Sequence, residues 1–116
     1  MSQMPLITEI AGLKEMIQSS DQQPLLLFKH STQCSISAKA YEELEKYSQT
    51  EDAKYVKIAI VHVIENRPVS NEIAGYFGIK HESPQAIWIK DGNAKWHASH
   101  RDITKEALEK NNPNNH

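Results

Sequence analysis

Two apolar runs constrain the fold of this chain more than any other feature of its sequence. Leu25–Phe28 is continuously apolar, and Tyr55–Val63 is largely apolar and rich in β-branched residues. A strand with one face in water alternates polar and apolar residues, whereas a strand buried on both faces does not need to alternate. Both runs therefore predict central strands of an α/β sheet.

The remaining segments predict helices and a hairpin around these strands. Four segments carry apolar residues at helical spacing or a helix cap: residues 8–17, 36–47, 69–77 and 104–108. Asp91–Gly92 is a hairpin signal between expected strands at 85–90 and 94–99. A right-handed crossover makes the first two strands parallel, and the hairpin adds an antiparallel pair. We expect a mixed sheet of four to five strands, with Leu6–Ile7 as the short fifth strand and helices on both faces.

Length and charge limit the classes of partner. The 116 residues predict a single domain over residues 1–110, followed by a disordered polar tail at 111–116. The net charge is −2 and no block of basic residues occurs, so we expect no nucleic-acid partner. No apolar run reaches the roughly 18 residues that a membrane span needs. The amino terminus lacks a secretory signal, so we expect a cytoplasmic monomer.

Cys34 is the only cysteine of the chain and lies where a buried strand gives way to a helix. The amino terminus of a helix carries a partial positive charge and free N–H groups, which favour a thiolate there. A lone cysteine is otherwise most often a small buried apolar residue. Its position at the strand–helix junction favours a reactive nucleophile.

Hydroxyl groups surround this cysteine in the sequence. Thr32 lies two residues before it, Ser35 directly follows it, and Ser37 occupies the place of the second cysteine in a Cys-x-x-Cys motif. We expect these three hydroxyls to support the thiolate. A hydroxyl cannot resolve a mixed disulfide, so a disulfide formed at Cys34 must be cleared by a thiol from another molecule.

Ser83–Pro84 opens the strand at residues 85–90. A proline there cannot donate to a ladder, which is typical of a turn and fits a cis peptide bond. The cysteine at a helix start, the proline before a later strand and the closing hairpin together resemble the thioredoxins. This resemblance implies a thioredoxin-like fold, in which Ser83 and Pro84 line the groove for a ligand or client chain.

Four segments carry a closer resemblance, to the YtxJ family of monothiol bacilliredoxins. They are FKHSTQCSISA at 28–38, RPVS at 67–70, HESPQA at 81–86 and WHASH at 96–100. The resemblance implies a thiol–disulfide oxidoreductase that removes bacillithiol from bacillithiolated client proteins, with bacillithiol as thiol cosubstrate and no tightly bound cofactor. Relatives in the resembled family commonly carry proline where this chain has Ser35. Because serine has a backbone N–H and proline has none, this chain has an additional N–H at the helix start.

Two alternatives and several other side chains remain open at this stage. The fold would also suit a non-catalytic adaptor or an iron–sulfur carrier like the monothiol glutaredoxins. The six histidines form no recognisable ligand pattern, so we expect no bound metal. His30 is either a simple strand-end residue or a contributor to the local potential. Arg67 and Lys80, near the proline, could offer cations to the carboxylates of a small thiol.

Overall fold

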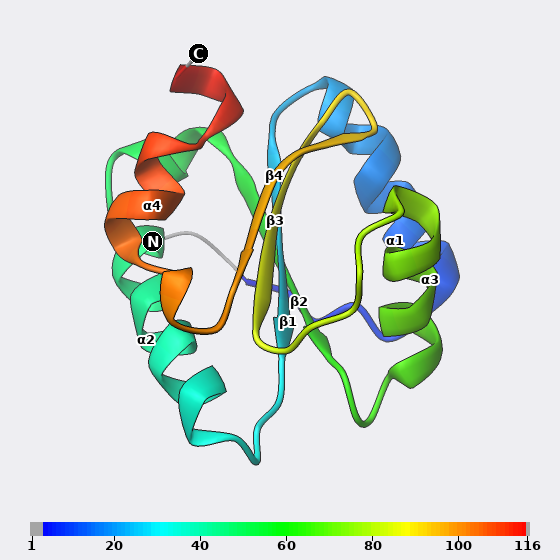
Figure 1. Ribbon diagram of the computed structural model, residues 1–116. Helices are drawn as coiled ribbons and strands as arrows, with labels where there is room; N and C mark the ends of the chain where they lie inside the picture. Colours follow the sequence, from blue (N-terminus) through cyan, green and yellow to red (C-terminus); the bar gives the residue numbers. More distant parts are fainter. Residues whose placement is uncertain (1–3, 116) are drawn as a thin grey trace.

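The computed structural model describes residues 4–115. Its main elements are α1 (Ile10–Gln18), β1 (Leu25–His30), α2 (Ser35–Ser48), β2 (Lys57–His62), α3 (Arg67–Phe77), β3 (Gln85–Lys90), β4 (Asn93–Ser99) and α4 (Lys105–Lys110). Short 3-10 turns join some of them, including η3 (His100–Asp102) after β4. Figure 1 shows the sheet in the middle of the molecule with helices on both sides.

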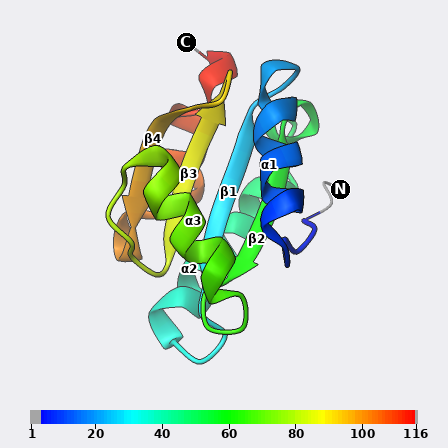
Figure 2. The ribbon, with the colours of Figure 1, turned by 90° about the vertical axis from the view of Figure 1, so that its right-hand side faces the viewer.

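The sheet has the order β2-β1-β3-β4, and β1 pairs with β2 in parallel and with β3 in antiparallel orientation. Leu6 forms only an isolated bridge to Ile60 rather than a fifth strand. Helices α1 and α3 cover the face that is turned to the viewer in Figure 2, and α2 and α4 cover the other face. The fold is the expected α/β mixed sheet of thioredoxin type.

Strand β1 is buried along its whole length because it contributes to two cores. Leu26 and Phe28 pack on the side of α2 and α4, whereas Leu25 and Leu27 pack on the side of α1 and α3. The continuous apolar run in the sequence follows from this double role. No helix of the described residues is both long enough and apolar enough to cross a bilayer.

The hairpin forms at the predicted turn, where Asp91 (φ 55°) and Gly92 (φ 75°) both have positive φ. Trp88 and Trp96 lie opposite each other across the hairpin. Trp88 is fully buried, donates from Nε1 to the Leu108 carbonyl at 3.0 Å, and meets the Tyr47 ring edge to face. Trp88 therefore joins the sheet to both helices of its face.

The end of the chain differs from the expected disordered tail. Asn112 is fully buried, and its Nδ2 donates to the Asp52 carboxylate at 2.7 Å. Tyr47 and Asn115 donate to the same carboxylate. Polar composition predicted a loose tail, but here the amides serve as hydrogen-bond partners for a half-buried acid. His116 lies outside the described residues.

We expect the substitution Asn112→Ala to lower the free energy of unfolding by about 1–3 kcal/mol, because it removes a buried hydrogen bond to a charged partner. Urea denaturation measures the change. Asn71→Ala, at an exposed position of α3, is the matched control and should stay within about 0.5 kcal/mol of the wild type. Equal stability of the two variants would show that the tail does not contribute to the fold.

Candidate functional site

Cys34 is the N-cap residue of α2 and is half-buried. Its backbone is extended (φ −114°, ψ 126°), and its carbonyl accepts the N–H of Ala38 at 3.0 Å. The first N–H groups of a helix have no partner within the helix, so they favour an anion at this position. The structure thus places a partly accessible thiol at the amino terminus of α2.

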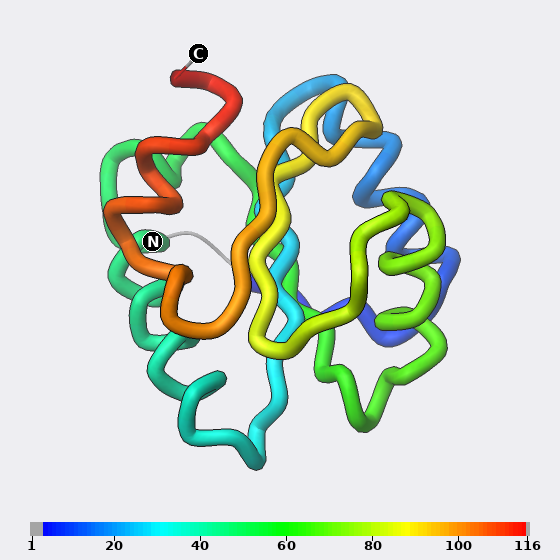
Figure 3. Tube along the Cα trace, in the orientation of Figure 1, coloured from blue at the N-terminus to red at the C-terminus, as the bar shows by residue number. Residues whose placement is uncertain are grey.

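The pairing of β1 with β3 brings a second segment, the loop before β3, close to Cys34. β1 and β3 are antiparallel and Lys29 lies opposite Gln85, so the start of β3 lies beside the end of β1. Figure 3 shows the loop before β3 and the loop that follows β1 at the same end of the sheet. The Ser83–Pro84 peptide bond is cis, as the sequence suggested. The loop that ends at Ser83–Pro84, called the proline loop below, therefore lies at the same end of the sheet as Cys34.

The proline loop is held on one side and open on the other. The Pro84 carbonyl accepts the N–H of His100 at 3.0 Å. Ser83 makes no hydrogen bond through its backbone or its buried hydroxyl to any described residue. The main chain at Ser83, a half-buried residue, is therefore without a hydrogen-bond partner among residues 4–115.

Ser37 faces inward rather than toward solvent. It is fully buried; its Oγ lies 2.7 Å from His30 Nδ1 and accepts the N–H of Ser31 at 3.0 Å. Among the described residues, no hydrogen bond joins Ser37 to the Cys34 sulfur. The hydroxyl thus fastens α2 to the end of β1, on either side of the loop that carries Cys34.

The other predicted hydroxyls lie at the surface. Thr32 and Ser35 are exposed, and the side chains of both are without hydrogen bonds within residues 4–115. Ser35 is the first residue of α2, next to Cys34. Of the predicted site residues, the structure therefore brings Cys34, Ser35, Ser83 and Pro84 to one edge and turns Ser37 away from solvent.

His30 is buried and helps to hold the loop that carries Cys34 through its contact with Ser37. Its ring stacks on Tyr41 with centroids 4.9 Å apart and lies 5.8 Å from the His62 ring. Burial lowers the pKa of His30, the charge of His62 lowers it further, and Glu65 opposes the shift. The imidazole is therefore held neutral, which suits a hydrogen bond with a serine hydroxyl.

Sequence reasoning missed a polar cluster on the α3 side of the sheet. Lys29 is fully buried, and its Nζ lies 3.1 Å from His81 Nδ1. The same ring nitrogen lies 3.3 Å from Ser70 Oγ. Burial lowers the pKa of Lys29 to about 8, and burial together with the charges of Lys29 and Arg67 lowers the pKa of His81. A lysine directly after an apolar run was the available signal, but nothing in the sequence indicated its partner.

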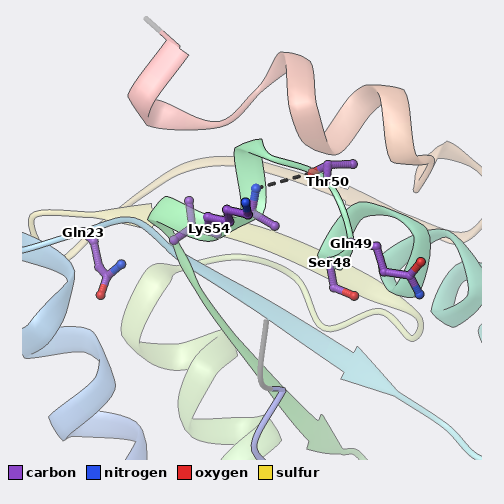
Figure 4. A pocket seen from close by; sticks show the side chains of 7 residues that line it. Gln23, Ser48, Gln49, Thr50 and Lys54 are labelled. Atoms are coloured by element: carbon purple, nitrogen blue, oxygen red, sulfur yellow. Dashed lines mark hydrogen bonds between the residues drawn. The ribbon is translucent and has the colours of Figure 1, made fainter. Parts of the chain in front are cut away.

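A cavity of about 350 Å³ at the other end of α2 is not part of this site. It is lined by residues that include Gln23, Ser48–Thr50 and Lys54, shown in Figure 4. Cys34 precedes the first turn of α2, whereas this cavity adjoins the last turn. Among the described residues no group of three potential metal-binding side chains occurs.

A thioredoxin-type sheet with a half-buried cysteine at the start of α2, beside a proline loop, defines a thiol oxidoreductase of thioredoxin fold. Residues 5–108 match the family described as the monothiol bacilliredoxin BrxC. The chain belongs to this family, whose name implies bacillithiol-linked chemistry.

Solved structures share the thioredoxin fold of this chain. One similar structure, described as a thioredoxin-fold protein for which an oxidoreductase role is suggested, is 28% identical with a TM-score of 0.81 and covers 90% of this chain and 89% of its own. Two thioredoxins show the shared fold alone, each at 17% identity. The one from Malassezia sympodialis has a TM-score of 0.78 and covers 95% of this chain and 90% of its own. The one from Fasciola hepatica has a TM-score of 0.73 and covers 92% of this chain and 94% of its own.

We expect Ser37→Ala to lower the free energy of unfolding by about 1–3 kcal/mol, because the His30 ring nitrogen and the Ser31 N–H lose their shared hydrogen-bond partner. Thermal or urea unfolding measures the difference. Ser35→Ala removes an exposed hydroxyl two residues away and should change stability by less than about 0.5 kcal/mol. Similar losses in both variants would contradict the fastening role of Ser37.

The pKa of His30 should lie below its ordinary value of 6.5 in the folded protein. Its contribution to stability is therefore present above about 6.5 and is lost as the pH falls from there through the folded-state value. An NMR titration of the His30 ring measures the pKa directly. His62→Gln should move the pKa upward and Glu65→Gln downward; a wild-type midpoint at or above 6.5 would contradict this account.

Proposed function

We propose that this protein removes bacillithiol from protein mixed disulfides, with Cys34 as the nucleophile. One observation supports this role above the others. The only cysteine of the chain is partly accessible at the start of α2, on the edge where the Ser83 main chain is unpaired. A single thiol can exchange with a mixed disulfide but cannot close a disulfide within the chain.

In the first step, the Cys34 thiolate attacks the bacillithiol sulfur of the mixed disulfide. A bond forms between this sulfur and Cys34 Sγ, while the bond to the client sulfur breaks and the client leaves as a thiolate. Cys34 is oxidised and the client cysteine is reduced, so electrons balance. The amino terminus of α2 supports the attacking thiolate, which is the main contribution of the fold to this step.

In the second step, the thiolate of another bacillithiol molecule attacks the bacillithiol sulfur held on Cys34. The products are bacillithiol disulfide and the free Cys34 thiolate. Ser37 cannot supply this thiol, because its side chain is a hydroxyl that is bonded to His30 and Ser31. The cycle therefore depends on a second thiol from solution.

The neighbouring residues have supporting roles in this proposal. Ser35 and Thr32 keep polar groups around the thiolate, and Ser37 fixes the loop that carries Cys34. Ser83 offers its main chain to the client next to the mixed disulfide, with Pro84 forming the side of the groove. A reducing cytoplasm, which keeps the single thiol free, fits this chemistry, and we expect the protein to act there as a monomer.

The proposal is tested with a client protein that carries one bacillithiol. Wild-type protein and excess bacillithiol should release the client thiol, whereas Cys34→Ser should leave only the uncatalysed rate. Mass spectrometry should detect bacillithiol on Cys34 when the second thiol is withheld. Equal release by both proteins would refute the nucleophile, and a brown, dimeric wild-type protein would favour an iron–sulfur carrier instead.

A further inference from the structure

A second cavity, of about 360 Å³, adjoins the first turns of α2, which begins at Ser35, the residue after Cys34. It is lined by Ser35, Ile36, Lys39, Ala40, His100 and Arg101. The first turns of α2 form one wall and the turn η3 forms the other, and Figure 1 shows this turn next to α2 at the end of β4. Its volume is at the lower end of the range of about 300–1,000 Å³ that is typical of small-molecule sites.

The charges of this cavity have one sign. Lys39 and Arg101 line it together with His100, and none of its lining residues carries a carboxylate. Neither Lys39 nor Arg101 forms a salt bridge with another described residue. Ammonium and guanidinium groups that are not in a direct ion pair are suited to bind the carboxylates of a ligand.

Acidic residues nearby do not fill this role. Glu43, one turn after Lys39, accepts the N–H of Lys105 and pairs with Lys46. Glu82 interacts with His100, but it does so from outside the cavity, as a residue of the proline loop. The charge of Lys39 also acts on Glu43, but neither Lys39 nor Arg101 forms a direct ion pair with a carboxylate among the described residues.

The cavity is also connected to the proline loop through His100. His100 has a positive φ of 55°, and its N–H donates to the Pro84 carbonyl at 3.0 Å. Non-glycine residues adopt this conformation infrequently, so the surrounding contacts must hold it in place. The hydrogen bond thus fixes one wall of the cavity relative to the groove.

We propose that this cavity binds the carboxylate-bearing part of the small thiol that becomes attached to Cys34. Lys39 and Arg101 would bind the carboxylates, while Ile36 and Ala40 provide apolar contact. The occupant is the small thiol rather than the client. After the client has left, the small thiol stays bonded to Cys34, which is next to the lining residue Ser35. This inference rests on the proposed function and adds the source of its specificity.

The test compares two mixed disulfides of one client protein, one with bacillithiol, which carries carboxylates, and one with neutral 2-mercaptoethanol. The double variant Lys39→Gln/Arg101→Gln is assayed against Lys14→Gln/Lys54→Gln. The control removes the same charge at exposed positions outside the cavity. Release of the client thiol is followed at several substrate concentrations, so that KM and kcat are separated.

We expect the cavity variant to raise KM for the bacillithiol adduct about tenfold, with kcat within about twofold of the wild type. The neutral adduct and the control variant should show wild-type values. An unchanged KM for the bacillithiol adduct would overturn the inference. An equal rise for both adducts would also overturn it, because the cations would then serve an acidic surface of the client. If the wild type releases neither adduct, it is the proposed function that fails.

Discussion

The pairing of β1 with two neighbours at once is the constraint on which the rest of the structure depends. β2 binds one edge of β1 and β3 binds the other, and helices cover both faces. Because β1 is central, its last residue has a fixed position in three dimensions, and so has the short loop that leads from it to Cys34. The antiparallel partner brings Pro84 to the same edge. The pairing of the strands therefore places the Cys34 loop and Pro84 at one end of the sheet, independently of contacts between their side chains.

The Ser37 contacts show how a one-thiol site differs physically from a two-thiol site. In a Cys-x-x-Cys motif the second position holds a resolving thiol, whereas here it holds a buried hydroxyl bonded to His30 and Ser31. The same position therefore contributes to stability rather than to exchange. This arrangement separates the support of the loop from its chemistry, which leaves Cys34 dependent on a thiol from another molecule.

The features predicted from the sequence are those with a local physical cause. The apolar run at Leu25–Phe28 predicted a doubly buried strand, and Asp91–Gly92 predicted the hairpin turn. The position of Cys34 at the helix start followed from the change of period after β1. Those not predicted depend on partners distant in the chain: Lys29 meets His81 52 residues later, and Asn112 meets Asp52 60 residues earlier. Composition cannot show that a polar residue has found such a partner.

The distribution of charge connects these observations with the choice of ligand. The chain as a whole has a net charge of −2, yet several basic groups gather at the edge where Cys34 lies. Lys39 and Arg101 line the cavity beside it, and Lys29 and Arg67 act on His81 in the proline loop. Basic side chains at such a place favour small anions, whereas the net negative charge of the chain disfavours general association with polyanions.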